Sequence, residues 1–563
     1  MTTSVRGRGR NSRSAGLGRG VHMKVVVDLT RCQGYAQCAF AAPDVFVMQG
    51  DEALLYDTDP DDAQREKIVR AAAACPVQAI FLDRDDTRDD TRIRKPAPET
   101  HVAAPGPGEA FKRTGHIVIV GASLAGLRAA RTLRQEGFTG SLTVIGDESH
   151  APYDRPPLSK QVLMGQVPAR RTGLPRRDEL DAHWRFGVAA TGLDLSGKQV
   201  LLADGAKVGF DRLLIATGVR ARPWPNEAEA ALDGLFALHT PEDAEGLRQR
   251  LAAGPGRVLV IGAGFTGCEV ASACRELDLQ VTVLDRGPAP LAGALGAVIG
   301  GVAAQMQRDN GVDLRCGVRV ESLEGDDSGR LRRARLSDGS TLDVEVALAA
   351  LGSIRNVEWL EGSGLAAGAW GVACDTGCRA VDVNGLVTDD VFVAGDVARC
   401  PHPVYDYQYL ALEHWGNAVA QAGIAAHNMI SAQSERWPHL ALPEFWSTQF
   451  GTEIKSVGVP THADHVVIAQ GSVAERRFVA VYGYRGRITA AVAFNQAKWL
   501  EFYAGLIDRA APFPPSFRTV DQSTDGHPVA AEVPERPTPQ ATVVVTGHGP
   551  SERRATLVRR TYL

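Results

Sequence analysis

The sequence has no long run of apolar residues. A membrane-spanning helix requires about 20 of them, whereas the longest candidates, such as 344–351, suit a buried strand. Residues 1–22 carry five arginines and no apolar segment, so they do not resemble a signal peptide, and we expect a disordered basic tail. We therefore expect no contact with a membrane.

A strong charge of either sign is also missing. The 61 Lys and Arg nearly balance the 66 Asp and Glu, and the net charge of −5 gives no reason to expect a nucleic-acid partner. The nine cysteines are an odd number without a secretory signal. This favours a reducing, cytoplasmic location over a disulfide framework.

Closely spaced cysteine pairs are absent as well. Cys268 and Cys274 lie six positions apart, and Cys374 and Cys378 lie four apart, so neither pair has C-x-x-C spacing. Chemistry of the disulfide-reductase kind therefore lacks its redox pair, and we expect these cysteines to be structural.

Changes in composition divide the 563 residues, a length that corresponds to about four domains. Residues 23–84 hold six Lys or Arg and ten Asp or Glu, a local charge of −4, and form a unit of their own. Residues 85–115 contain four prolines and a repeated Asp-Asp-Thr-Arg, which is typical of a linker. Residues 518–563, rich in Pro, Thr and Gly, are expected to be a mostly flexible tail, although Thr542–Val545 could form one strand.

Three cysteines of the N-terminal unit have the spacing of iron–sulfur ligands. Five residues separate Cys32 from Cys38, with Tyr35 at the midpoint, and Cys75 precedes Pro76. Bacterial ferredoxins use a C-x2-C-x2-C run and a distant Cys-Pro. A phenol, with an ordinary pKa of about 10, is a poor ligand beside thiolates. Three thiolates therefore predict a 3Fe–4S cluster, with 4Fe–4S as the alternative.

Two other interpretations of these cysteines stay open. Zinc normally takes four ligands, and no fourth Cys or His lies in 23–84. Three buried structural cysteines would rarely show this spacing. The segment 38–46 closely resembles the single-cluster ferredoxins that serve actinobacterial monooxygenases, and 77–80 resembles the strand that closes such domains. This resemblance favours the cluster.

Two glycine-rich turns follow, each inside a strand–turn–helix–strand pattern. In the first pattern, strands are expected at 116–121 and 142–145, with a helix between them that ends at about Arg134. In the second, strands are expected at 257–261 and 280–284, with a helix that ends at about Leu277. The strands are apolar and rich in β-branched residues, as buried parallel strands require. Both patterns predict dinucleotide-binding folds.

The first turn carries Gly121, Ser123 and Gly126, and the acidic pair Asp147-Glu148 follows the next strand. Such glycines allow a tight turn, the helix start faces a pyrophosphate, and the acid accepts hydrogen bonds from ribose hydroxyls. Ser123 replaces the middle glycine of the fingerprint.

The second turn has the complete fingerprint in Gly262, Gly264 and Gly267, with Asp285 ending the next strand. A carboxylate at that place accepts from the 2′-hydroxyl of NADH and repels the 2′-phosphate of NADPH. Arg286 keeps NADPH open as the alternative, because an arginine can bind a phosphate.

Residues 152–160, Pro-Tyr-Asp-Arg-Pro-Pro-Leu-Ser-Lys, resemble the signature of FAD-dependent ferredoxin reductases of the putidaredoxin-reductase type. Ala216-Thr217-Gly218 and 393–396 resemble two further flavin motifs of that family, and the similarity covers about 116–515. Besides the glycine turn, it implies that FAD contacts Ala125, Asp147, Arg155, Lys160, Ala190, Arg222, Asp396 and Trp415.

Two more residues have a role only by this resemblance. Glu269 matches a family position near the nicotinamide, and its alternative is a first-turn acid stabilised by the helix dipole. Trp446, in a segment that resembles the FWS-x-Q motif of the family's interface domain, could line the flavin site or fill the core.

The expected fold is an α/β reductase with two Rossmann-like dinucleotide-binding domains and an α+β C-terminal interface domain, preceded by a small α+β ferredoxin domain. We expect FAD to bind 116–225 and 351–430, NAD(H) to bind 226–350, and the interface domain to span 431–517.

The resemblance implies an electron-transfer enzyme without catalytic acid, base or nucleophile. NADH gives up two electrons together and a cluster takes one, so a flavin belongs between them. The expected acceptor is an external cytochrome P-450-type monooxygenase. A ring-hydroxylating dioxygenase and a redox-sensing role are the alternatives. A flexible 31-residue linker spans about 30 Å, which would let the ferredoxin meet both its reductase and its acceptor.

Overall fold

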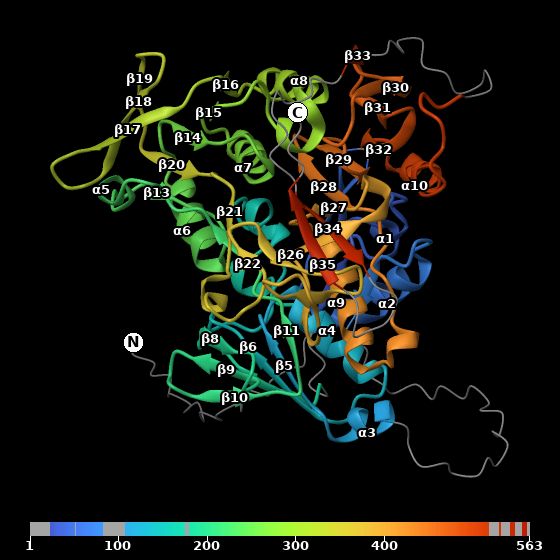
Figure 1. Cartoon of the computed structure of the whole chain (residues 1–563). Helices are drawn as coiled ribbons and strands as arrows, with labels where there is room; N and C mark the ends of the chain where they lie inside the picture. The colour runs from blue at the N-terminus through green and yellow to red at the C-terminus, as the bar shows by residue number, and fades with distance from the viewer. Residues whose placement is uncertain are drawn as a thin grey trace, which may run out of the picture.

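The computed structural model describes residues 23–50, 52–82, 107–174, 180–516, 529–530, 541–546 and 554–559. In Figure 1 a first Rossmann-type domain lies at the bottom, a second at the upper left and a C-terminal domain at the upper right. The N-terminal domain, drawn in blue, lies beside the C-terminal domain. Within the described residues no helix is long and apolar enough to cross a membrane. The expected tail 1–22 lies outside the described residues.

The N-terminal domain is a small α+β unit. Its elements are β1 (Val25–Val27), α1 (Gln37–Ala41), β2 (Phe46–Gln49), β3 (Ala53–Tyr56), α2 (Arg65–Ala74) and β4 (Ile80–Leu82). Strand β1 pairs antiparallel with β4, and β2 pairs antiparallel with β3. Phe46 and Ile68 are fully buried in its core.

The strand expected at 77–80 is misplaced. Gln78 has a left-handed φ of 52° and its N–H donates to the Cys75 carbonyl, which makes a turn there. Strand β4 therefore begins only at Ile80.

The end of the expected linker is a helix. Helix α3 spans Pro107–Thr114, and Phe111 packs on the core of the first Rossmann-type domain with its ring 5.9 Å from that of Phe138. The linker interpretation is therefore wrong for this segment, and residues 83–106 lie outside the described part of the chain.

The first Rossmann-type domain is built on a six-stranded sheet. Its order is β24 (Arg379–Val381), β25 (Val387–Val393), β11 (Arg212–Ile215), β5 (His116–Val120), β6 (Ser141–Ile145) and β7 (His183–Arg185). Helices α4 (Leu124–Gln135) and α9 (Trp415–Ile430) pack together on it. The strand, helix and strand predicted around the first glycine turn are confirmed.

Smaller sheets complete this domain. They are β8 (Ala190–Asp194), β9 (Gln199–Leu202) and β10 (Lys207–Gly209), and β22 (Ala367–Gly368), β23 (Gly371–Ala373), β26 (Ala398–His402) and β27 (Gln408–Leu410). Strands β12 (Val219–Ala221) and β21 (Ser353–Arg355) pair where the chain leaves the domain and returns to it.

The second Rossmann-type domain has a five-stranded parallel sheet. Its order is β13 (Leu235–Phe236), β20 (Val346–Ala349), β14 (Val258–Ile261), β15 (Val281–Asp285) and β16 (Asp313–Cys316). Its helices are α5 (Glu227–Ala230), α6 (Pro241–Ala252), α7 (Phe265–Glu276) and α8 (Ala292–Asp309), and β17 (Val320–Gly325), β18 (Leu331–Leu336) and β19 (Thr341–Asp343) form an antiparallel sheet. The elements predicted around the second glycine turn are confirmed.

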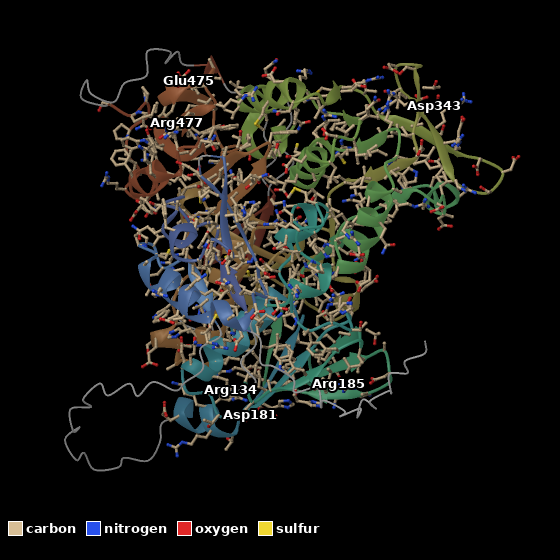
Figure 2. All side chains as sticks on the ribbon, turned by 180° about the vertical axis from the view of Figure 1, so that it is seen from behind. Arg134, Asp181, Arg185, Asp343, Glu475 and Arg477 are labelled. Atoms are coloured by element: carbon tan, nitrogen blue, oxygen red, sulfur yellow. The ribbon has the colours of Figure 1, made fainter. Side chains whose placement is uncertain are left out.

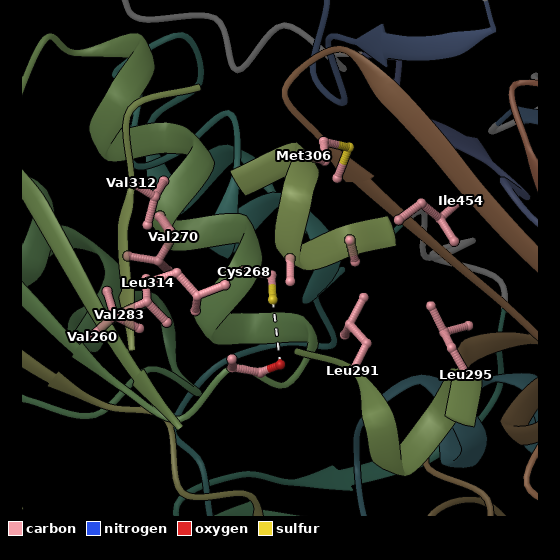
Figure 3. Close-up of a cluster of buried hydrophobic side chains, with 14 of the residues drawn as sticks. Val260, Cys268, Val270, Val283, Leu291, Leu295, Met306, Val312, Leu314 and Ile454 are labelled. Carbon is pink, nitrogen blue, oxygen red and sulfur yellow. Dashed lines mark hydrogen bonds between the residues drawn. The ribbon is translucent and has the colours of Figure 1, made fainter. Parts of the chain in front are cut away.

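The C-terminal domain is an antiparallel sheet with one helix. The order is β28 (Glu444–Gln449), β29 (Thr452–Gly458), β32 (Arg487–Phe494), β31 (Arg477–Tyr484), β30 (His465–Ser472) and β33 (Val529–Ala530), with α10 (Leu500–Asp508). Ile454 of β29 joins Leu291 and Leu295 in a core shared with the second Rossmann-type domain (Figure 3). The two domains are thereby joined by apolar packing.

The C-terminal tail contains more structure than the sequence predicts. Strand β34 (Ala541–Thr546) includes the one strand considered possible, and it pairs antiparallel with β35 (Arg554–Arg559). Strand β34 has β-branched residues at 542–546, which favours an extended conformation once the two segments are paired. The interpretation as a mostly flexible tail does not hold for these strands.

Candidate functional site

Two positions of the first glycine turn require glycine. Gly121 has φ +120°, and a Cβ there would lie 2.0 Å from the Ala216 carbonyl oxygen. A Cβ on Gly126 would lie 1.9 Å from the Gly121 carbonyl oxygen. Helix α4 begins after Ser123 without a side-chain cap, so its first N–H groups are available to a phosphate.

A cavity of about 730 Å³ opens above this turn. It is lined by strand ends, the 152–160 segment, the start of α9 and part of β28. The expected FAD contacts on its wall are Gly121, Ser123, Ala125, Asp147, Glu148, Arg155, Lys160, Ala190, Asp396 and Trp415. Gly126 lies beneath the wall, where it lets the helix approach the turn. The volume and the phosphate-ready helix start fit a dinucleotide such as FAD.

Arg222 is the exception among these residues. It is exposed, and its guanidinium donates to the Ser353 carbonyl at 3.0 Å. Strand β12 runs away from the cavity, so Gly218, Val219 and Arg220 line the wall, whereas Arg222 lies beyond it. The expected contact at Arg222 is therefore not supported, and Arg220 takes that place on the wall.

The two acids after β6 have different surroundings. Arg155 donates to Glu148 at 2.6 Å and Tyr153 donates to the same carboxylate at 2.7 Å. Burial raises the pKa of Glu148, but Arg155 and these hydrogen bonds outweigh it and lower the pKa below its ordinary value. Asp147 is exposed at the cavity wall. Asp147 is thus the acid free to accept from a ribose, while Glu148 orients Arg155.

A buried ion pair joins three domains at the cavity wall. Lys160 lies 2.6 Å from Glu269 of α7, which also accepts from Ser159 at 2.6 Å and from Ser447 of β28 at 2.7 Å. Glu269 is buried and lies beyond the first turn of α7, so it is not the first-turn acid that was the alternative for it. The pair places a fixed positive charge and its counter-charge on the wall.

Asp396 lines the same cavity at the point where β25 meets α9. Gly395, with φ +79°, lets this segment approach α4, since a Cβ there would lie 3.2 Å from the Ala125 Cβ. Burial, and then the charge of Glu413, raises the pKa of Asp396 to about 7. A carboxyl in such surroundings is suited to a hydroxyl partner on a bound ligand.

The second glycine turn repeats the geometry of the first. Gly262 has φ +106° with a would-be Cβ 2.2 Å from the Ala350 carbonyl oxygen, and a Cβ on Gly267 would lie 1.9 Å from the Gly262 carbonyl oxygen. Gly264 faces open space at the start of α7. Asp285 accepts from the backbone N–H groups of Ala263 at 2.7 Å and of Gly287 at 2.6 Å, which fixes its carboxylate at the edge of the turn.

The three N-terminal cysteines lie within electrostatic reach of one another. Burial raises the pKa of the Cys32 thiol, although the charge of Lys455 opposes the rise. Burial, and then the charges of Cys32 and Cys75, raise the pKa of Cys38 to about 11. The N–H of Ala79 donates to the Cys75 sulfur at 3.3 Å, as backbone groups do to cluster thiolates. Tyr35 is 53% exposed and its hydroxyl donates to Gln33.

No group of three His, Cys, Asp or Glu among the described residues has the geometry of a single-metal site. Cluster ligands bind different iron atoms and therefore lie farther apart than the ligands of one ion. Cysteine sulfurs that accept from a backbone N–H fit an iron–sulfur cluster, whereas a zinc ion normally takes four ligands.

The cysteine-bearing domain contacts the wall of the cavity. Tyr56 donates to Asp154 at 3.2 Å, and the indole of Trp415 donates to the other oxygen of Asp154 at 3.0 Å. Thr30, two residues before Cys32, touches the start of α9, since a Cβ on Gly416 would lie 3.3 Å from the Thr30 methyl group. One carboxylate therefore connects the N-terminal domain to the cavity.

The sequence matches the family described as pyridine nucleotide-disulphide oxidoreductase over residues 115–422. The chain belongs to this family. Residues 444–527 match the reductase C-terminal family, and residues 25–82 match the 4Fe-4S single cluster domain family. The chain therefore joins an iron–sulfur ferredoxin domain to a reductase.

Relatives specify the type of reductase. The chain is 35% identical to a probable ferredoxin reductase of Castellaniella defragrans over 69% of this chain and 92% of that one. It is 32% identical to putidaredoxin reductase of Pseudomonas putida over 68% and 90%. The crystal structure of the covalent putidaredoxin reductase–putidaredoxin complex matches with TM-score 0.66 and 29% identity over 71% of this chain and 94% of that one. The chain is an oxidoreductase of the ferredoxin-reductase type.

Five of the six remaining cysteines of this ferredoxin reductase are buried, and Cys316 is half-buried. Cys268 donates to the Ala263 carbonyl at 3.3 Å (Figure 3), and burial raises its pKa above the ordinary range. Cys274, Cys374 and Cys378 are buried too, with raised pKa values. High-pKa buried thiols are unreactive, in agreement with the structural role expected for them.

Sequence reasoning missed several residues of this ferredoxin reductase. Asp154 stands inside the 152–160 segment, but nothing local shows that it meets Tyr56. Lys455 and Glu453 alternate with apolar residues along β29, a pattern that indicates a solvent-facing side. Both are only 2% exposed because the ferredoxin domain covers them. Trp446, left open between two roles, lines the cavity with its ring 6.3 Å from that of Trp415.

Proposed function

We propose that the chain passes electrons from NADH through FAD to its own iron–sulfur cluster, and from there to an external acceptor protein. A bound flavin takes an electron pair and gives up electrons singly, which is the chemistry that this relay needs. FAD would be held by the cavity residues named above, NADH by Gly262, Gly264, Gly267, Glu269 and Asp285, and a 3Fe–4S cluster by Cys32, Cys38 and Cys75. NADPH and a 4Fe–4S cluster are the less favoured alternatives.

The contact between the cluster loop and the cavity wall carries this proposal. Thr30 touches Gly416, and Trp415 shares Asp154 with Tyr56. The described position of the ferredoxin domain therefore places the segment that leads to Cys32 against residues next to the cavity wall. Such an arrangement supports transfer within one chain without a diffusional encounter.

The residues of the chain have binding and positioning roles. The Lys160–Glu269 pair would hold its charges beside the flavin ring and exclude water from it. The fixed Asp285 carboxylate would accept from a ribose hydroxyl and repel a 2′-phosphate. We propose a cytoplasmic location, which the free state of all nine cysteines supports.

The proposed acceptor is a cytochrome P-450-type monooxygenase. A cluster site built from cysteines without histidine supports this over a Rieske-dependent dioxygenase. Reductase components named for biphenyl and p-cumate dioxygenase systems are 34% and 33% identical to the chain, so a ring-hydroxylating dioxygenase is the second candidate. A human protein named apoptosis-inducing factor 3 is 30% identical, which keeps a redox-sensing role as a third.

Anaerobic titration with NADH tests the relay order. The flavin absorbance should bleach first, and the paramagnetic signal of an oxidised three-iron cluster should then disappear. A Cys75→Ala variant should keep flavin reduction and lose delivery to a haem acceptor. Cys316→Ala, a matched control in β16 of the second Rossmann-type domain, should keep both. Normal delivery by Cys75→Ala, or folded protein without iron and sulfide, would overturn the proposal.

A further inference from the structure

A lysine of the reductase is buried directly against the cluster loop. Lys455 is 2% exposed, and its ammonium group donates to the Cys32 carbonyl oxygen. Its counter-charge is Glu453, 3.2 Å away and equally buried. Burying an ion pair costs several kcal/mol per ion unless further hydrogen bonds compensate. The Cys32 carbonyl supplies one of these bonds from the ferredoxin domain.

Strand β29 holds this lysine rigidly. Every residue of Thr452–Gly458 is buried, with Ile454 packed into the core shared with the second Rossmann-type domain (Figure 3). Because side chains alternate along a strand, Glu453 and Lys455 point to the opposite side, toward the ferredoxin domain. Lys455 pairs across the sheet with Trp446, which lines the flavin cavity.

Other contacts hold the ferredoxin domain at the same place. Glu52 accepts from the N–H of Ala497 at 2.9 Å. The turns at Gly50 and Gly451 meet closely, since a Cβ on Gly50 would lie 2.1 Å from the Gly451 carbonyl oxygen. The lysine therefore meets the Cys32 loop only in the docked arrangement of the two parts.

We propose that Lys455 raises the reduction potential of the cluster while the ferredoxin domain is docked on the reductase. This rests on the cluster of the proposed function. One electron passes from the reduced flavin, supplied by NADH, to the cluster, which then carries one more negative charge. A buried ammonium group near Cys32 stabilises that charge, because Coulomb interactions are strong in a medium of low effective dielectric. Undocking removes the lysine and leaves the cluster a stronger reductant toward the acceptor.

Redox titration of the full-length protein, followed by paramagnetic resonance, tests this at pH 8.5. A Lys455→Met variant should shift the cluster potential to more negative values by about 59 mV. For one electron, this is about a tenfold lower reduced-to-oxidised ratio at a given potential. Lys455→Arg keeps the positive charge, so its cluster potential should stay close to that of the unaltered protein. The matched control is Lys67→Met, which removes an equal charge from an exposed ion pair with Asp44 on the ferredoxin domain and should shift the potential little.

The Glu453→Gln variant tests the direction of the shift in cluster potential independently. It keeps the lysine and removes the nearby negative charge, so the cluster potential should move in the positive direction. The flavin potential should change less than the cluster potential in each variant. Shifts of the same sign in Lys455→Met and Glu453→Gln, or no shift in Glu453→Gln with normal iron and sulfide content, would overturn the proposal. Absence of a cluster from the unaltered protein would instead refute the proposed function.

Discussion

At the scale of single residues, two glycine turns in the chain obey one steric rule. Gly121 and Gly262 have positive φ angles beneath a carbonyl oxygen, and Gly126 and Gly267 press against the first glycine of their own turn. A Cβ at 1.9 Å from a carbonyl oxygen cannot be accommodated without moving backbone. The helix starts that would face the phosphates can therefore take these positions only because four residues of the turns have no Cβ.

Gly267→Ala should impair the second turn without disturbing the first. The new Cβ would force the turn away from Gly262, so we expect the KM for NADH to rise at least tenfold while the flavin content stays normal. Steady-state kinetics with ferricyanide and flavin quantification on the same preparation measure both. Gly301→Ala is the matched control, because that glycine lies on an exposed face of α8 with open space around it. An unchanged KM in Gly267→Ala would contradict the argument.

At the scale of elements, the sequence was sufficient where periodicity and a turn agreed. The apolar, β-branched stretches flanking Gly121–Gly126 and Gly262–Gly267 predicted both strand–helix–strand units. The sequence was insufficient where contacts between distant parts of the chain determine the local structure. Strand β4 begins only at Ile80 because Gln78 has a left-handed φ and forms a turn. Helix α3 is stabilised because Phe111 packs on the core of the first Rossmann-type domain. Neither cause is visible locally.

Most of the candidate site was also predictable from motifs, since ten of the twelve expected FAD contacts line one cavity. The expected FAD contact at Arg222 is not supported, because strand β12 places Arg222 beyond the cavity wall. Arg220, two residues earlier, lines the wall and was not predicted. The roles of Lys455 and Asp154 could not be found, since their partners Cys32 and Tyr56 lie in another domain. Spacing rules describe local chemistry and say nothing of contacts between domains.

The anchoring role of α3 can be tested at Phe111. Its ring is half-buried, 4.2 Å below the Arg212 guanidinium carbon and 5.9 Å from the Phe138 ring. Phe111→Ala should lower the free energy of unfolding of the reductase by about 2 kcal/mol through lost apolar contact, and thermal unfolding would measure it. Arg113→Ala, an exposed neighbour, should change stability by less than about 0.5 kcal/mol. Equal effects of the two variants would show that α3 does not anchor the chain.

At the scale of the whole molecule, the ferredoxin domain has to combine tight docking with release. Figure 2, which views the molecule from behind, shows its blue ribbon between the C-terminal domain and the first Rossmann-type domain. Residues 83–106, which join the ferredoxin domain to the reductase, lie outside the described part of the chain. Acceptor access therefore depends on how strongly the interface holds, and buried acids at the interface make that strength depend on pH.

Docking should weaken as the pH rises through neutrality. Burial, with the charge of Asp28 on the ferredoxin domain, raises the pKa of Glu444 to about 7, and burial raises that of Asp154 to about 6. On undocking these acids gain water, and their pKa values fall toward the ordinary range. The docked state therefore binds more protons between about pH 4.5 and 7, so raising the pH favours release. Glu444 alone gives about a tenfold larger undocking constant at pH 8 than at pH 6.

Small-angle scattering at pH 6 and pH 8 would measure the change as a larger radius of gyration of the full chain at the higher pH. Glu444→Gln should reduce that difference, because the amide has no charge to regain on undocking. Glu475→Gln is the matched control, since this exposed acid lies at the outer edge of the C-terminal domain (Figure 2) and should leave the difference intact. A chain that is more compact at pH 8 than at pH 6 would show the opposite proton linkage. Docking would then gain from ionised acids rather than from the burial of a protonated Glu444.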